Sequence, residues 1–68
     1  MFHTRMRAER LKRGWSQTRL GSKASLSASD VSRIETRRLQ PYPEQLARLA
    51  RALRLSPDEL LESVRVDQ

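Results

Sequence analysis

The chain has 68 residues, with 14 Lys and Arg against 8 Asp and Glu, a formal charge of +6 and no cysteine. A chain this short forms a single domain, here 1–68, that buries only about 60% of the surface its unfolded form exposes, so we expect no large buried active site. No stretch reaches the roughly 18 apolar residues of a membrane span, and the first residues lack the apolar core of a signal peptide. We therefore expect a cytoplasmic protein without membrane contact.

The charge is unevenly distributed along the chain. Residues 1–38 hold ten basic and three acidic groups, a net +7, whereas residues 39–68 hold four and five, a net −1. A positive charge concentrated in one half indicates a polyanion partner, either nucleic acid or an anionic membrane face. The membrane face is disfavoured because the most basic region is broken at Gly14 and at the turn after Ala24, so it forms no long amphipathic helix. Twelve of the fourteen cations are Arg, the better group for bidentate contact with phosphate or guanine.

The first two predicted helices cover 4–13 and 17–24. Gly14 ends the first of them, and Ser16 is a suitable N-cap for the second. The inward face of the second helix holds Leu20, Gly21 and Ala24.

A third helix is predicted over 28–36. Ser27 and Asp30 have the spacing of a capping box, with Asp where Glu or Gln is usual, so Asp30 is expected to cap its own helix. Val31 and Ile34 would then face inward.

A fourth helix is predicted after the irregular stretch 36–43, because Pro43 suits a first helical turn. Its apolar face is marked by Leu46, Leu49, Ala50 and Leu53.

The clearest helix start in the chain is Ser56-Pro57-Asp58-Glu59, which has a Ser cap, Pro at the first helical position and Glu at the third. It predicts a fifth helix ending near 64, with Arg65–Gln68 as a frayed tail and an ordered core over about 4–64. No strand is predicted.

The two short helices 17–24 and 28–36 form a helix-turn-helix arrangement, in which Gly21 lets the helices approach closely. A spaced pattern of residues runs with this arrangement from 5 to about 63: Arg10, Gly14, Ser16-Gln17, Leu20-Gly21, Lys23, Leu26-Ser27, Val31 to Glu35, Pro41, Leu46, Leu49-Ala50, Ala52-Leu53, Leu55-Ser56 and Asp58 to Leu61. In these residues the chain resembles the Cro/C1 (XRE) family of phage and bacterial repressors. The resemblance implies an all-α, compact five-helix, lambda-repressor-like DNA-binding domain.

Three positions depart from the family pattern. Ser25 and Arg37 stand where the family usually has Gly, and Ala24 stands where it usually has a larger apolar residue. A left-handed backbone costs a non-Gly residue roughly 1 to 2 kcal/mol, so either these positions adopt another conformation or the domain bears some strain.

The resemblance implies that helix 28–36 enters the major groove of double-stranded DNA. The implied base-reading residues are Ser27, Ala28, Ser29, Ser32 and Arg33. The implied phosphate-binding residues are Gln17, Lys23, Thr36, Arg37, Arg38 and Tyr42. Arg33 can donate two hydrogen bonds to guanine, although by itself it would be a solvated surface Arg. Because Ala28 and Ser29 are short, some specificity is expected from DNA shape.

The resemblance also implies a structural ion pair and a dimer. Arg10 and Glu35 occupy positions at which the family often joins the first and third helices by a partly buried pair. The expected homodimer interface comprises Leu55, Pro57, Leu60, Leu61 and Val64. Core packing is expected for Trp15 and for Met6, Leu11, Leu20, Leu26, Val31, Ile34, Leu46, Leu49 and Leu53.

The sequence therefore predicts a sequence-specific DNA-binding transcriptional regulator, acting as a repressor. An enzyme is disfavoured because no nucleophile and base, paired carboxylates or phosphate-binding Gly run is recognisable. No metal, cofactor or small-molecule effector is expected, since His3 has no second His or Cys beside it. The alternative is an antitoxin or restriction-modification controller, whose partner is a protein such as a toxin as well as its own promoter.

Overall fold

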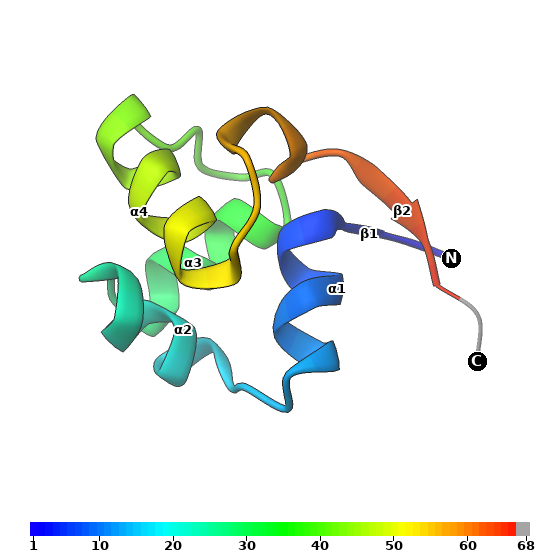
Figure 1. Cartoon of the computed structure of the whole chain (residues 1–68), viewed down its shortest axis with the longest axis horizontal. Helices are drawn as coiled ribbons and strands as arrows, with labels where there is room; N and C mark the ends of the chain where they lie inside the picture. The colour runs from blue at the N-terminus through cyan, green and yellow to red at the C-terminus, as the bar shows by residue number, and fades with distance from the viewer. Residues whose placement is uncertain (67–68) are drawn as a thin grey trace.

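Helix α2 packs against α3 and α4, α4 also packs against α1, and the two ends of the chain pair as strands beside α1, as the computed structural model shows for residues 1–66 (Figure 1). The elements in order are β1 (Phe2–Thr4), α1 (Arg5–Lys12), α2 (Gln17–Ala24), α3 (Ala28–Glu35), α4 (Pro43–Leu53), a single 3-10 turn η1 (Pro57–Glu59) and β2 (Ser63–Arg65). The described part of the chain thus has four α-helices, and none of them is long and apolar enough to cross a membrane.

Short polar side chains start the first three helices. The hydroxyls of Thr4, Ser16 and Ser27 accept hydrogen bonds from backbone N–H groups three residues later, at 3.0 to 3.1 Å. Each bond satisfies one of the N–H groups that a helix leaves without an internal partner. The predicted caps at Ser16 and Ser27 are confirmed. The Asp30 carboxylate, which was expected to cap α3, lies 3.8 Å from Arg33 Nη1 instead.

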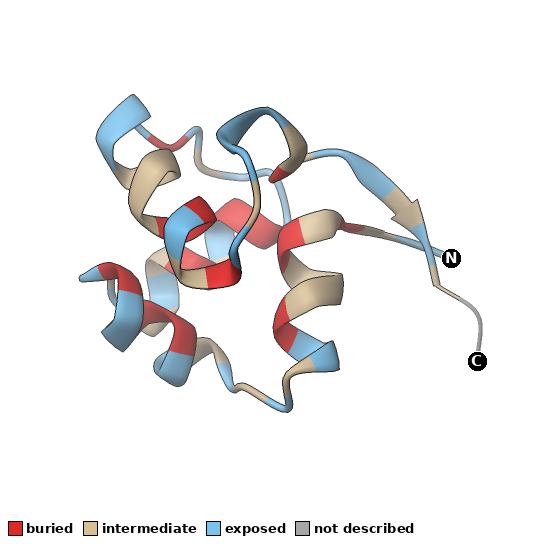
Figure 2. Ribbon diagram, viewed as in Figure 1, coloured by how far each residue is buried: buried red, intermediate tan, exposed pale blue. Residues whose placement is uncertain are grey.

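The apolar core lies where the four helices meet, seen as the buried segments that face one another in Figure 2. Nine hydrophobic side chains are buried there: Met6, Leu20, Ala24, Val31, Ile34, Leu49, Ala50, Leu53 and Leu60. Trp15, Leu26 and Leu46, also predicted as core, are partly buried against them. Leu11 was wrongly placed in the core, because it is 48% exposed. It lies five positions after Met6, and five positions of a helix place two side chains about 140° apart around its axis.

The predicted fifth helix is wrong beyond its first turn. Its cap exists, since Glu59 Oε1 accepts hydrogen bonds from the Ser56 N–H at 2.9 Å and the Ser56 hydroxyl at 3.0 Å. After η1, however, the carbonyl of Leu60 accepts the N–H of Met6 at 2.9 Å, and that of Glu62 accepts the N–H of Arg5 at 2.8 Å. These bonds satisfy the first turn of α1 and hold the chain in a non-helical path.

Two short strands stand where none was expected. β1 and β2 pair antiparallel, with His3 opposite Val64 and Thr4 opposite Ser63. Arg65 belongs to this ladder, so it is not part of a frayed tail, and the remainder of that predicted tail at 67–68 lies outside the described residues. The resulting two-stranded sheet lies beside α1.

Ser25 and Arg37, which stand where glycine was expected, both adopt the left-handed conformation with φ of 57° and 60°. The turn geometry of the family pattern is therefore kept without its glycines. Each of these positions carries the backbone cost of roughly 1 to 2 kcal/mol that a Cβ brings to that region.

Candidate nucleic-acid interface

The junction of α2 and α3 is set by a close backbone contact at Gly21. The N–H of Leu26 donates to the Gly21 carbonyl at 2.8 Å, and a Cβ added at Gly21 would lie 2.4 Å from the Leu26 carbonyl oxygen. Only glycine fits here without a backbone shift, and the close contact is with the turn that joins α2 to α3. The contact fixes the angle at which α3 leaves the turn.

The exposed side of α3 carries the predicted base-reading residues together. Ser27, Ser29 and Arg33 are exposed, while Ala28 and Ser32 are half-buried. The Arg33 side chain is 61% exposed, and its only ion pair among residues 1–66 is the loose one with Asp30. Its guanidinium is therefore free to turn outward. We call this set of five residues the reading face.

A hydrogen-bonded ion pair joins the carboxyl end of α3 to α1. Arg10 Nε donates to Glu35 Oε2 at 2.7 Å and Arg10 Nη2 donates to Glu35 Oε1 at 3.1 Å, with both residues buried. Arg10 Nη1 donates to the Trp15 carbonyl at 2.7 Å. The predicted pair is confirmed, and it joins α1, the loop before α2 and α3. Its net contribution to stability is small, whereas removing one partner costs about 3 to 5 kcal/mol.

Gln17, at the first turn of α2, is tied to this pair. Its Nε2 donates to Glu35 Oε1 at 3.1 Å, and the residue is half-buried. The contact orients the side chain at the amino end of α2, where exposed backbone N–H groups suit an anion.

The other predicted phosphate-binding residues are not all brought together. Arg38 and Tyr42 are exposed beyond α3, and the Thr36 hydroxyl donates to the Ser32 carbonyl at 3.0 Å. Arg37 Nη2 instead donates to the Leu61 carbonyl at 3.0 Å and the Ser63 hydroxyl at 2.9 Å. The structure thus gives Arg37 a contact with the C-terminal segment.

Lys23 lies on a different side of α2. It follows Gly21 by two residues, a rotation of about 200° around the helix, so it points away from the side that touches α3. Its Nζ lies 4.9 Å from the centroid of the Trp15 ring. Lys23 is therefore separated from the reading face.

The residues expected at a dimer interface divide into two groups. Leu55, Leu61 and Val64 are half-buried and Pro57 is exposed, so each has surface to offer. Leu60 has 0% exposure and packs in the core of its own chain. Its assignment to an interface is therefore wrong, because the unpredicted path after η1 turns it inward.

The two carboxyls with perturbed pKa values serve the fold. A hydrogen bond from Arg13 lowers the pKa of Glu9, and hydrogen bonds from the Ser56 backbone and hydroxyl lower the pKa of Glu59. Neither lies on the reading face. Residues 1–66 contain no group of three His, Cys, Asp or Glu side chains placed to hold a metal ion.

Helix α3 is capped by Ser27, its Glu35 is bonded to Arg10 of α1, and a tight turn at Gly21 joins it to α2. Two short helices joined in this way define the class of helix-turn-helix proteins. A family model described as a helix-turn-helix domain matches residues 4–63, and the chain belongs to this family. The fold and the family are those of DNA-binding regulators of the Cro/C1 type, not those of enzymes.

A solved structure supports the same class. The chain is 38% identical to the P22 c2 repressor protein in a crystal structure with the synthetic operator 9T in the presence of Tl+, with a TM-score of 0.80. The match covers 85% of this chain and 88% of that one. No curated protein matches the chain.

Proposed function

We propose that the protein is a sequence-specific, double-stranded DNA-binding transcriptional repressor that inserts α3 into the major groove. The observation that carries this proposal is the reading face: Ala28, Ser29, Ser32 and Arg33 share one side of α3, Ser27 caps its start, and Glu35 ties the same helix to Arg10. The similarity to a repressor crystallised with an operator supports it.

Base recognition is assigned first to Arg33. Its fork can donate two hydrogen bonds to guanine O6 and N7, a contact worth about 1 to 3 kcal/mol of discrimination. The serines of the reading face are short, and Ala28 offers only a methyl contact to thymine. Specificity beyond Arg33 then depends on the shape and deformability of the operator.

Backbone phosphates are assigned to Gln17, Thr36, Arg38 and Tyr42. Gln17 is oriented by Glu35 at the amino end of α2, and the other three follow or flank the end of α3. Arg37 and Lys23 are removed from this set, because their side chains contact the C-terminal segment and the Trp15 ring.

A homodimer is part of the proposal, with half-sites about one helical turn apart. Leu55, Pro57, Leu61 and Val64 supply its surface on each protomer. Sedimentation well above micromolar concentration should show dimers, and a monomer there would contradict this assignment.

The test of function is selection of bound sites from a random duplex pool, repeated with Arg33→Ala. We expect a two-fold symmetric preferred site for the parent chain. The variant should lose about 5- to 150-fold in affinity for that site and lose its preference at one base pair of each half-site, the equivalent of about 1 to 3 kcal/mol. Binding that weakens with salt but shows no preferred sequence would contradict the proposal.

A further inference from the structure

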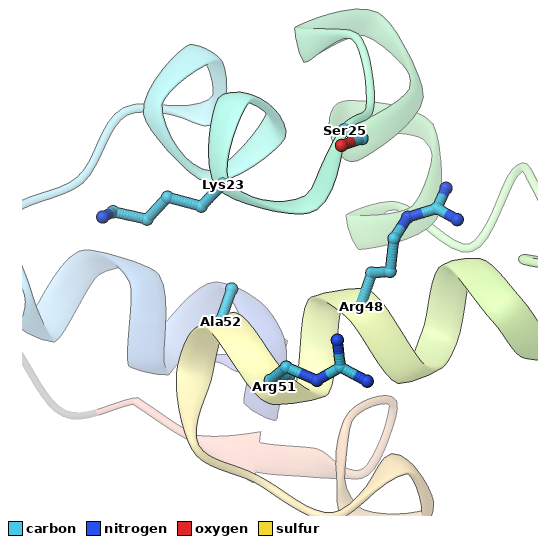
Figure 3. Close-up of a pocket in the computed structure, with 5 residues that line it drawn as sticks. All are labelled: Lys23, Ser25, Arg48, Arg51 and Ala52. Atoms are coloured by element: carbon cyan, nitrogen blue, oxygen red, sulfur yellow. The ribbon is translucent and has the colours of Figure 1, made fainter.

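A cationic groove runs between α2 and α4, on the side of α2 that Lys23 occupies. It consists of two adjoining hollows of about 490 and 520 Å³ that share Lys23 and Ala52 in their walls. In Figure 3, Lys23 near the end of α2 and Ser25 just after it lie across from Arg48, Arg51 and Ala52 on α4. We call it the α2–α4 groove, and its five cations are Arg13, Lys23, Arg48, Arg51 and Arg54.

The groove has uncompensated positive charge. No carboxylate lines it, and only Arg13 and Arg48 have acidic partners, Glu9 at 2.6 Å and Glu44 at 2.8 Å. None of the ion pairs among residues 1–66 involves the other three cations, all of which are exposed. Lys23 lines both hollows, with Arg51 in one and Arg54 in the other, and an anion placed between such like charges would relieve their repulsion.

The groove is separate from the reading face. Gly21 marks the side of α2 against α3, and Lys23 lies about 200° around the helix from it. Arg48 Nε donates to the Ala24 carbonyl at 2.8 Å, which holds the carboxyl end of α2 against α4. A duplex seated on α3 would therefore leave the groove open.

The floor of the groove favours a peptide over a nucleotide. Trp15 and Ala52 supply apolar surface there. The Trp15 ring already has Lys23 Nζ at 4.9 Å and Arg13 Cζ at 5.6 Å from its centroid, so stacking a base on it would displace a cation. An aliphatic side chain can rest on the remaining apolar surface while neighbouring carboxylates reach the cations.

We propose that the α2–α4 groove docks an acidic peptide segment of a partner protein. Asp or Glu carboxylates of the segment contact Lys23, Arg51 and Arg54, and an aliphatic side chain of the segment rests on Ala52 and on the part of Trp15 that the cations leave open. Because the reading face lies elsewhere, the partner can bind while the protein sits on DNA. Docking at this groove does not depend on the function proposed above.

The test uses the full chain and a synthetic peptide of glutamates with interspersed leucines, with Gln in place of Glu as the control peptide. Trp15 is the only tryptophan, so its fluorescence reports binding at the groove itself. We expect the glutamate peptide to shift that fluorescence and the glutamine peptide to leave it unchanged. Absence of a shift with the glutamate peptide would overturn the proposal.

Two variants with equal loss of charge separate the two surfaces. Arg51→Gln with Arg54→Gln should weaken the peptide about tenfold and leave duplex affinity within about twofold. Arg33→Gln with Arg38→Gln should leave the peptide unchanged and weaken the duplex. Equal peptide weakening in both variants would mean a general charge effect, and duplex weakening in the groove variant would mean that nucleic acid occupies the groove; either result overturns the proposal. If the parent chain binds peptide but no duplex, the function proposed above fails and the groove assignment stands.

Discussion

The two sides of α2 differ in how closely they are packed. On the side facing α3, a Cβ at Gly21 would lie 2.4 Å from a backbone oxygen, and Gln17 is bonded to the buried Glu35. On the side facing α4, Lys23 stands over an open groove with two further cations that have no ion pair. One helix therefore has a tight side that sets geometry and an open side that leaves room for a ligand.

The difference shows that on a small basic protein the surface with the most positive charge need not be the surface whose geometry is fixed most firmly. The reading face has one exposed Arg and otherwise short side chains, yet it is the surface held rigidly by the ion pair. The α2–α4 groove has more positive charge, and three of its cations, Lys23, Arg51 and Arg54, have no ion pair among residues 1–66. Substitutions on the tight side should cost stability, and those of the unpaired groove cations Lys23, Arg51 and Arg54 should not.

The largest effect is expected from Glu35→Ala on the tight side. It leaves Arg10 buried at 6% exposure without its carboxylate and frees Gln17, so unfolding free energy should fall by about 3 to 5 kcal/mol in denaturant titration. The matched control is Glu62→Ala, which removes an exposed pair at 3.6 Å and should cost less than about 1 kcal/mol. Equal losses in the two variants would contradict the anchoring role of Glu35.

A smaller loss is expected from Gly21→Ala. The added methyl meets the Leu26 carbonyl, which is backbone and cannot swing aside, so we expect a cost of about 1 to 3 kcal/mol. Ser22→Ala, one residue further on the exposed side of the same helix, should be neutral or slightly stabilising. Thermal melting of both variants checks this, and an unchanged melting temperature for Gly21→Ala would show that the two helices can move apart.

The smallest effect is expected for the Arg13–Glu9 ion pair at the edge of the groove, whose contribution to stability depends on pH. The hydrogen bond from Arg13 lowers the pKa of Glu9 below its usual 4.5, so the stability it contributes is present above that pH and is lost as pH falls through the folded-state pKa. The difference in melting temperature between the parent chain and Glu9→Gln should therefore shrink as the solution is acidified below that value. A constant difference down to the lowest pH at which both fold would disprove this linkage.

Local sequence signals account for the helix-turn-helix well. Ser16 and Ser27 each place a cap, and the predicted range of the second helix coincides with α2. The need for glycine at position 21 could be predicted because so short a turn brings backbone close to α2, where a larger residue would not fit. These signals act over three or four residues, which is the range that sequence patterns describe best.

The C-terminal segment could not be predicted in the same way. Its start signal at Ser56 is real, but the backbone N–H groups of Arg5 and Met6, more than fifty residues away, determine where the helix stops. That long-range pairing also turns Leu60 into the core. A local pattern holds no information about such a distant partner.

The α2–α4 groove was missed for a related reason. Its cations come from the end of α1, from α2 and from α4, and three of them belong to the half of the chain with a net charge of −1. Counting charge along the sequence averages them with acidic residues that lie elsewhere. The signal that remained visible was Arg48 and Arg51, which stand three residues apart on one helix.

The strand pair also brings residues 1 and 66 next to each other. The N–H of Val66 donates to the Met1 carbonyl at 3.0 Å, so the first residue and the last described one are neighbours (Figure 1). A short linker could join them, and new ends could be opened in the irregular stretch between α3 and α4 with the native contacts kept. A label or fused domain would then enter between α3 and α4 and would leave the paired strands untouched.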